Sequence, residues 1–355
     1  MTLTILELAL SAIVIVVAAA LFTNAVEILG DRLDLDQGSI GSVLAAVGTA
    51  LPETMIPVVA ILAAVFAGRD LETAGEIGIG AILGAPFMLA TLAMFVVGFS
   101  ALVFRNRREH GAEIRCGEVT ADEVPWCKAP GKSVNIDADT IGRDIVFFVI
   151  FFAAAGVVEL LYSLKVALAL LLVVAYALYV RRTLHTGAAL EEVPERLTLW
   201  RRNSPPPSWA IVGQALIALI LIVVGAQIFV DAVEHAAGSA RLPAGLVALV
   251  LAPLATELPE KINSVIRVRD SKDTLALGNI TGAMVFQSTV PVTFGVLFTR
   301  WELEPLSLFS VLLALVSAGF IYFALRRRKT LQSWQLMLGG LFYLVFLAGA
   351  VVAVT

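Results

Sequence analysis

Two apolar segments of the chain carry the same five-residue pattern, Thr-x-Leu-Pro-Glu, in their middle. The pattern occupies residues 49–53 and again residues 256–260, 207 positions further on. Each copy joins a carboxylate and a threonine hydroxyl to a proline, and small hard cations bind oxygen groups of this kind. The repeated pattern therefore predicts a cation site.

The prolines of both copies add a second source of oxygen. Proline has no N–H group, and its ring clashes with the carbonyl four residues earlier in a helix. Pro52 and Pro259 are thus expected to free the backbone carbonyls of Gly48 and Ala255. Free backbone oxygens at membrane depth are tolerated only where they line a cavity or a site, so both carbonyls count as predicted ligands.

The residues around the first copy are typical of a membrane-spanning segment. Glu53 is the one charged residue between Ser39 and Ala67, and this stretch is long enough to cross a bilayer. A carboxylate there is costly unless it has partners or water. The structural alternative is that Glu53 and Glu260 are neutral, hydrogen-bonded acids that seal helix contacts; the repetition of so costly a group favours a transporter.

The composition indicates a chain that lies mostly in lipid. Of its 355 residues, 59% are hydrophobic and 15% are charged, whereas soluble domains are about 45–50% apolar. We expect an all-α polytopic membrane protein whose partners are the lipid bilayer and inorganic cations, with no nucleic acid. The ten expected transmembrane helices are 3–29, 38–67, 74–103, 141–162, 164–181, 208–235, 242–267, 273–299, 304–325 and 332–354.

The distribution of basic residues predicts the orientation. Lys and Arg concentrate in every second loop, including the cluster Arg326–Lys329, and basic loops face the cytoplasm. Both termini then lie outside the cell membrane of a bacterium or archaeon. Residues 1–10 contain Glu7 but no Lys or Arg, so the first span is expected to be a retained helix rather than a signal peptide.

Both cysteines lie in the longest polar loop, residues 104–140, which this topology places in the reducing cytoplasm. We expect Cys116 and Cys127 to be free thiols there. A metal site formed with His110 is the alternative, although the spacing of the cysteines matches no familiar zinc pattern.

The two halves of the chain repeat beyond the five-residue pattern. Residues 22–53 align with 229–260 without a gap, and Gly80–Ala85 resembles Gly278–Ala283 in a second, glycine-containing block. Five spans per half make the halves enter the membrane from opposite sides, as in an inverted repeat. We expect repeats at 1–183 and 208–355, a linker at 184–207, Pro-Glu motifs at 48–53 and 255–260, and glycine blocks at 80–89 and 278–287.

These residues resemble the two α-repeats of the calcium/cation antiporter superfamily, of the sodium/calcium exchanger type. That family carries Gly-Thr-Ser-x-Pro-Glu in one helix and Gly-Asn-x-x-Gly-Ser-Asn-x-x-Asn/Asp in the next, twice and in opposite orientation. The resemblance implies ten helices in two inverted five-helix repeats. It also implies Glu53 and Glu260 as central cation ligands, with Thr49 and Thr256 as oxygen donors.

The chain departs from the family pattern at several ligand positions. The serine after threonine is Ala50 in one half and Glu257 in the other, so one hydroxyl is lost and one carboxylate is gained. The three polar positions of the glycine block are Ala81, Pro86 and Leu89 in the first half, and Asn279, Met284 and Gln287 in the second.

The expected cation-binding set is Glu53, Glu260, Thr49, Thr256, Glu257, Gln287 and Asn279 with the carbonyls of Gly48 and Ala255. Calcium takes six to eight oxygens, so most of these groups must converge or water must help. Three close carboxylates are not expected to ionise together, because burial and like charge raise carboxylate pKa values. Proton coupling is therefore a natural expectation.

Each member of the set also has a structural interpretation. Glu257 would in that case face a water-filled vestibule, and the threonines would bond to backbone carbonyls. Gln287 and Asn279 would join helices through hydrogen bonds.

The predicted function is secondary active cation antiport by alternating access, with Na+/Ca2+ exchange first and Ca2+/H+ or Na+/H+ exchange as the alternative. A non-transporting scaffold or sensor with a degraded ion site is a further alternative. No enzyme activity and no cofactor are expected, since the spans show no HExxH motif and the chain has no Gly-x-x-x-x-Gly-Lys loop.

Overall fold

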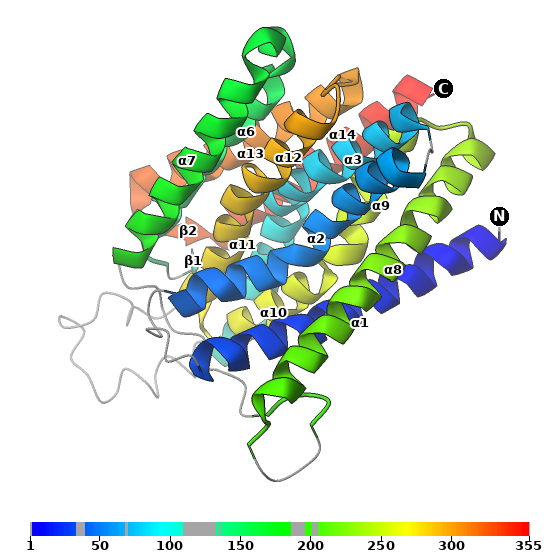
Figure 1. The fold of residues 1–355 in the computed structure, drawn as a ribbon. Helices are drawn as coiled ribbons and strands as arrows, with labels where there is room; N and C mark the ends of the chain where they lie inside the picture. The colour runs from blue at the N-terminus through cyan, green and yellow to red at the C-terminus, as the bar shows by residue number, and fades with distance from the viewer. Residues whose placement is uncertain are drawn as a thin grey trace, which may run out of the picture. The chain divides into compact units, whose positions relative to one another are not determined.

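The structure, a computed structural model, is built almost wholly from helices (Figure 1). It describes residues 2–32, 40–67, 70–108, 133–134, 136–185, 196–200 and 205–354. Within these residues, eight helices are long and apolar enough to cross a membrane, and shorter apolar helices lie at Glu53–Phe66 and Ala244–Thr256. The chain is thus a helical membrane protein, as its composition predicts.

The helices follow the predicted spans closely. They are α1 Thr2–Arg32, α2 Ile40–Ala67, α3 Leu71–Met88, α4 Met94–Val103, α6 Ala138–Val157, α7 Lys165–His185, α8 Ser208–Ala240, α9 Ala244–Thr256, α10 Leu258–Arg269, α11 Asp273–Gln287, α12 Val290–Phe298, α13 Pro305–Arg328 and α14 Ser333–Val354. The third, seventh and eighth predicted spans each consist of two helices. The expected separation of the fourth and fifth spans is a 3-10 segment, η2 (Glu159–Leu164), where Leu161 leaves helical geometry at φ −115° and ψ 36°.

The chain forms two compact units, each of which combines segments from both halves of the sequence. The first unit contains residues 1–85, 157–259 and 286–303, and the second contains residues 86–156, 260–285 and 304–355.

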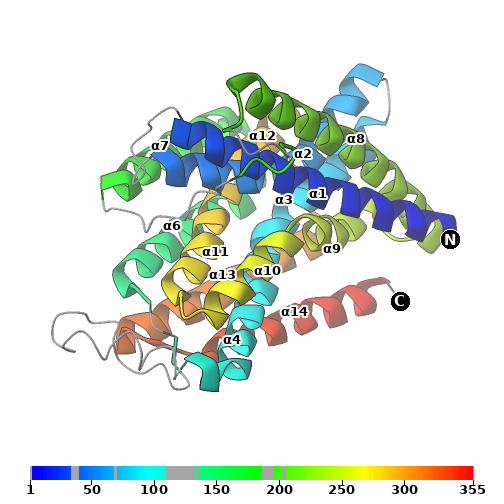
Figure 2. The ribbon, with the colours of Figure 1, turned by 90° about the horizontal axis from the view of Figure 1, so that it is seen from below.

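In the first unit, α1 and α8 lie side by side (Figures 1 and 2). They run antiparallel, because Gly225 packs against Ile15 while Gln214 Nε2 donates to the carbonyl of Leu21 at 2.9 Å. The same amide donates to Asn24 Oδ1 at 2.9 Å. Asn24 in turn accepts from the backbone N–H of Thr198 at 2.9 Å, so the segment 196–200 is attached to this helix pair.

The core of the first unit joins this pair to α2, α3 and α9. Buried apolar side chains from all five helices meet in one cluster, among them Ile15, Ile56, Ile77, Val233 and Ala248. Apolar contact of this kind fixes the helices on which the predicted ligands lie.

Glycines of the first glycine block let α3 approach α9. A Cβ at Gly80 would overlap the carbonyl oxygen of Gly245, and one at Gly84 would overlap that of Leu249. Small residues spaced four apart allow helices to approach closely in this way. In the second block, by contrast, a Cβ added at Gly278 would have no atom within 4 Å.

In the second unit, α4 packs against α14 (Figure 2). A five-residue π-helix, η1 (Leu89–Ala93), connects α3 to α4. It also contacts α14, where a Cβ at Gly339 would overlap the carbonyl oxygen of Thr91. π-Helical turns often occur at functional sites, and this one begins at Leu89, the last residue of the first glycine block.

The predicted loop 104–140 begins later than expected. Helical geometry returns after Phe104 and continues to Arg108, whose side chain is fully buried and paired with Asp273 at the start of α11. At the other end of the loop, strand β1 (Ser133–Val134) pairs antiparallel with β2 (Leu331–Gln332) between α13 and α14. Cys116, Cys127 and His110 lie outside the described residues.

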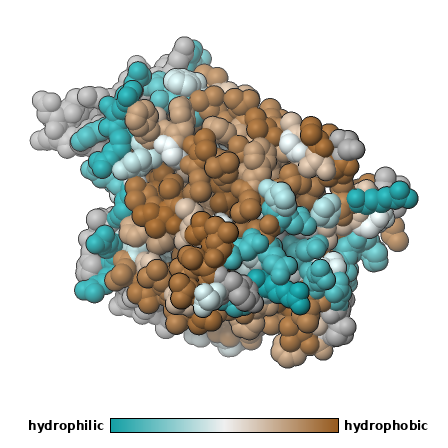
Figure 3. All heavy atoms as spheres, turned by 90° about the horizontal axis from the view of Figure 1, so that it is seen from above, coloured by the Kyte–Doolittle hydropathy of each residue, from teal (hydrophilic) through white to brown (hydrophobic). Residues whose placement is uncertain are grey.

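Apolar side chains cover much of the surface visible in Figure 3. Large hydrophobic residues are exposed on several helices, for example Phe66, Leu160 and Val352. Exposed apolar surface of this extent marks a membrane or protein contact, and the length of the helices identifies it as the lipid-facing surface.

Candidate functional site

Glu53 of the first Pro-Glu motif lies buried on α2, with 6% of its surface exposed. Ile56, almost one turn further along the helix, belongs to the core of the first unit, so Glu53 is held by a packed helix. The side chains of residues 40–52 are not among those described. The predictions for Gly48 and Thr49 therefore stay predictions.

The second Pro-Glu motif lies at a helix break. α9 ends at Thr256 and α10 begins at Leu258, while Glu257 between them has φ −85° and ψ 1°. Pro259 thus stands in the first turn of α10, where a proline leaves no intrahelical hydrogen bond unmade.

In the first motif, by contrast, α2 runs through Pro52 as one helix. Since proline has no N–H group in either setting, the carbonyls of Gly48 and Ala255 stay predicted ligands.

Thr256 and Glu257 are both buried, and Glu257 is fully so. The hydroxyl of Thr256 donates to the carbonyl of Ala252 at 3.1 Å, which is the structural role considered for the threonines. A hydroxyl that donates its proton keeps lone pairs for a cation, so both roles are compatible. The side chain of Glu260 is outside the described side chains, and its role as a ligand stays a prediction.

Gln287 ends α11 and is 1% exposed. Neither its Nε2 nor its Oε1 has a hydrogen-bond partner among the described residues. An unsatisfied buried amide is costly, by about 1–3 kcal/mol, which favours a ligand role over the helix-joining role. Asn279 lies further back on α11 and is partly exposed.

The structure thus brings four predicted ligands into the first compact unit, all with buried side chains: Glu53, Thr256, Glu257 and Gln287. Glu260 and Asn279 belong to the second unit. Within the described side chains, no group of three or more His, Cys, Asp and Glu residues is placed to hold a metal ion. Any cation at these residues would need amide, hydroxyl, carbonyl or water oxygens as well.

The first glycine block offers no polar ligand at the positions where the family pattern has one. Ala81, Pro86 and Leu89 are all buried. The sequence shows that these three residues carry no polar side chain, and the structure buries all three.

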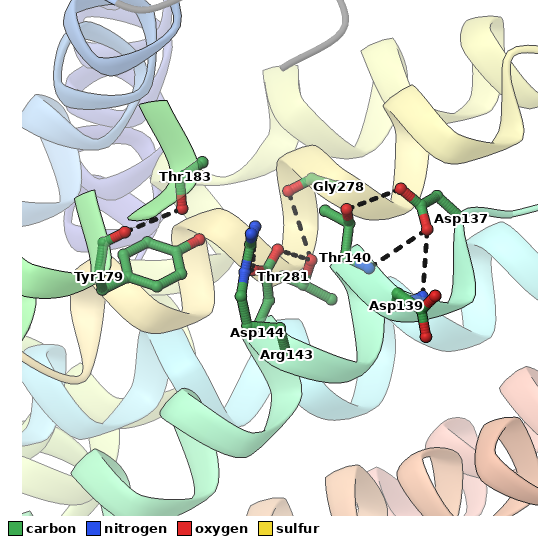
Figure 4. Close-up of polar contacts among 9 residues, drawn as sticks. All are labelled: Asp137, Asp139, Thr140, Arg143, Asp144, Tyr179, Thr183, Gly278 and Thr281. Carbon is green, nitrogen blue, oxygen red and sulfur yellow. Dashed lines mark hydrogen bonds and ion pairs between the residues drawn. The ribbon is translucent and has the colours of Figure 1, made fainter. Parts of the chain in front are cut away.

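Sequence reasoning missed Asp144, a buried carboxylate on α6 (Figure 4). Its Oδ2 accepts a hydrogen bond from the hydroxyl of Thr281 at 3.0 Å, and Thr281 belongs to the second glycine block. Its Oδ1 accepts from Arg143 Nη2 at 3.2 Å. An acidic residue inside the predicted span 141–162 was the signal that could have found it, because such residues are rare and often functional.

α6 is positioned by a cap at its first turn. Asp137 accepts hydrogen bonds from the backbone N–H of Asp139 at 3.1 Å and from the hydroxyl of Thr140 at 2.7 Å (Figure 4). Partial burial raises the pKa of Asp137, but the hydrogen bonds from Thr140 and Asp139 and the charge of Arg143 outweigh it, so the pKa lies below its ordinary value.

Comparison with known proteins identifies the family of the chain. The sequence pattern of the family described as "Sodium/calcium exchanger protein" matches residues 3–184 and 210–355. The inner membrane protein YrbG of Escherichia coli (strain K12) is 27% identical over 294 residues, which cover 81% of this chain and 78% of the relative. A putative antiporter, CaxA, of Alkalimonas amylolytica is 22% identical over 276 residues, covering 77% and 74% of the two chains.

Two kinds of solved structure share the fold. The crystal structure of the H+/Ca2+ exchanger CAX matches with a TM-score of 0.73 at 20% identity, over 97% of this chain and 82% of that chain. The sodium-calcium exchanger NCX_Mj, soaked with 2.5 mM Na+ and 10 mM Sr2+, matches with a TM-score of 0.57 at 19% identity over 98% of both chains. With both parts of the family pattern present, the chain belongs to the sodium/calcium exchanger family.

Proposed function

We propose that the protein is a secondary cation antiporter that exports or imports Ca2+ in exchange for Na+ by alternating access. Its ten spans form two inverted five-helix repeats in this proposal, and both termini face outward. Ions bind at the two Pro-Glu motifs, and competition between ions for the same carboxylates couples their movement.

One observation supports this function most directly. Glu53 on α2 and Glu257 at the break between α9 and α10 are buried acids, and they share a compact unit with the buried, unsatisfied amide of Gln287. Charged groups at membrane depth are costly and are typically kept for ion pathways. Family membership independently favours cations as the cargo.

A proton as the counter-ion is the second candidate. It is favoured by the buried, apolar Ala81, Pro86 and Leu89, which leave fewer oxygens for several sodium ions. Carboxylates grouped at low dielectric tend to keep a proton, and its release would then accompany cation binding.

The antiparallel pair α1 and α8 is the element that we expect to move. The two helices occupy corresponding positions in the two halves of the sequence. Alternating access requires such a pair to slide or tilt against the helices that carry the site.

The test is uptake of radioactive calcium into liposomes that contain the purified protein, under an outward sodium gradient or an outward proton gradient. Glu53→Gln is expected to lower uptake at least a hundredfold, because it removes a charged ligand without changing its size. Glu72→Gln, at an exposed glutamate in the first turn of α3, is the matched control and should leave uptake unchanged.

Each result assigns the counter-ion or rejects the proposal. Uptake under the sodium gradient establishes Na+/Ca2+ exchange, and uptake under the proton gradient alone establishes Ca2+/H+ exchange. Absence of uptake under both gradients, or full uptake by Glu53→Gln, would reject calcium antiport at this site and leave Na+/H+ exchange or a scaffold.

A further inference from the structure

One side of α13, a helix of the second unit, carries exposed apolar residues along most of its length. These residues are Leu308, Leu312, Val316 and Phe323. At 3.6 residues per turn they lie within about 80° of one another around the helix, and the opposite side is buried, for example at Ile321. Because α13 is long and apolar enough to span a membrane, the four residues form a lipid-facing stripe.

The last turn of α13 adds two arginines to this stripe. By the same helical spacing, Arg326 and Arg327 lie at the two edges of the lipid-facing stripe, whereas Arg328 lies on the far side of the helix. All three side chains are exposed. The surface that faces lipid therefore ends in a pair of guanidinium groups.

Aromatic side chains of the preceding turn hold both guanidinium groups. The guanidinium carbon of Arg327 lies 4.3 Å from the centroid of the Phe323 ring. Arg326 Nε donates to the hydroxyl of Tyr322 at 3.0 Å, and its guanidinium carbon lies 5.6 Å from the centroid of that ring. Both arginine side chains thus lie back along the helix, toward the membrane, instead of extending into water.

These contacts fix the two arginines but leave most of their hydrogen-bond donors unused. A guanidinium has five N–H donors. Within the part of the chain that the structure describes, Arg326 uses one of them and Arg327 uses none, and neither residue pairs with a carboxylate. Their planar donor groups match the oxygens of a phosphate, to which arginine binds in a bidentate manner.

Trp334, in the first turn of α14, indicates the depth of this end of α13 in the membrane. Its exposed ring lies 6.5 Å from the ring of Phe320, and tryptophans of membrane helices gather at the boundary between hydrocarbon and headgroups. Phe323 lies about 5 Å further along α13 than Phe320. The guanidinium over Phe323 is then at headgroup depth, since the headgroup layer is about 5–7 Å thick.

We propose that Arg326 and Arg327 bind the phosphate of an anionic phospholipid whose acyl chains lie along the lipid-facing stripe. The negative headgroup complements the two guanidinium groups, and the chains complement the apolar residues below them. A zwitterionic phospholipid has the same phosphate, but its own cation competes with the arginines. Orientation in the membrane needs only positive charge, so it does not require two stacked arginines at the edges of this stripe. The inference holds whichever ions the protein moves.

Thermal unfolding of the purified protein in detergent tests this site. Phosphatidylglycerol or phosphatidylcholine with the same acyl chains is added, and the lipid fraction that gives half-maximal stabilisation is measured. We expect the wild type to need about tenfold less phosphatidylglycerol than phosphatidylcholine. Arg327→Gln should raise the required phosphatidylglycerol about tenfold, because it removes a charge-assisted contact with phosphate. Phe323→Leu should raise it about threefold, because it removes the ring that holds the guanidinium.

Arg328→Gln is the matched control. It removes the same charge from the same end of α13 but from the far side of the helix, so it should raise the required phosphatidylglycerol by about twofold at most, since salt screens exposed charges. Arg327→Lys keeps the charge and should still cause a shift of about threefold, because an ammonium does not bind phosphate in a bidentate manner. If Arg327→Gln does not fold, Arg326→Gln carries the same expectation.

Four results would overturn the proposal. Equal shifts in Arg327→Gln and Arg328→Gln would reduce the effect to net charge, and equal stabilisation by the two lipids would remove the preference for an anionic headgroup. The same stabilisation by sodium phosphate without lipid would assign the arginines to a soluble anion. Stronger stabilisation by phosphatidylglycerol after replacement of Glu118, Asp122 and Glu123 by glutamine would show that this acidic segment, rather than lipid, occupies the arginines.

Discussion

Both amide atoms of Gln287 are buried without hydrogen-bond partners among the described residues. Folding alone would favour an apolar side chain there, because an unsatisfied buried polar group costs about 1–3 kcal/mol. In the proposed site the Oε1 of Gln287 would bind the cation, since the amide nitrogen is a donor. The neighbouring Thr289 differs, since its hydroxyl donates to the carbonyl of Phe286 at 2.9 Å.

This difference predicts that Gln287→Leu weakens cation binding without lowering the stability of the protein. Without cations the variant should be as stable as the wild type or about 1 kcal/mol more stable, while cation-induced stabilisation should weaken about tenfold in concentration. Gln335→Leu is the control, because Gln335 Oε1 accepts from the backbone N–H of Gln332 at 2.8 Å. The Gln335→Leu variant should lose stability and keep its cation response. If Gln287→Leu lost as much stability as Gln335→Leu, Gln287 would have a structural role.

At the scale of elements, the contact between α3 and α9 depends on glycines rather than on large apolar side chains. The carbonyl oxygen of Leu249 occupies the space that a Cβ at Gly84 would need, whereas an added Cβ at Gly75 on the same helix meets nothing within 4 Å. The same substitution should thus have opposite effects at the two positions.

Gly84→Ala is expected to destabilise the protein by about 1–3 kcal/mol, because α3 must move away from α9. Gly75→Ala is expected to stabilise it by about 0.5–1 kcal/mol, because alanine favours a helix over glycine. Thermal unfolding of both variants in one detergent measures the difference. A similar stability for the two would contradict the tight contact.

The eight long apolar helices of the described residues could be predicted from the sequence, because lipid requires long apolar runs and those runs are visible without any knowledge of packing. The sequence did not predict that the helix breaks at Glu257 but continues through Pro52. A proline shows where a hydrogen bond is missing, but the neighbouring helices decide whether the chain bends there.

For the site, the repeated motif pointed to Glu53 and the resemblance to the family pattern pointed to Glu257 and Gln287; the structure finds all three buried. Asp144 and Lys261 were not singled out, since neither belongs to a repeated pattern. Only the structure reveals their burial and their contacts with the two glycine blocks, at Thr281 and Met88. Contacts between residues more than a hundred positions apart are not visible in one sequence.

At the scale of the whole molecule, the orientation in the membrane follows from charge. Three arginines end α13, and their exposed side chains include Arg327 stacked on Phe323 at 4.3 Å from the ring centroid. Basic residues beside a span are retained on the cytoplasmic side. The end of α13 should therefore be cytoplasmic, and α14 should return the chain to the outside.

Reporter fusions measure this directly. A green fluorescent protein fused after Lys329 should fluoresce, and one fused after Thr355 should stay dark, because that protein does not fold when exported unfolded across the membrane; alkaline phosphatase should give the opposite pattern. Replacement of Arg326, Arg327 and Arg328 by glutamine should weaken the contrast, since it removes most of the charge that retains this loop. The reverse pattern in the unmodified chain would place both termini in the cytoplasm. The Pro-Glu motifs would then lie at the same depth in the membrane, but the side of the protein that we assign to the cytoplasm would face outward.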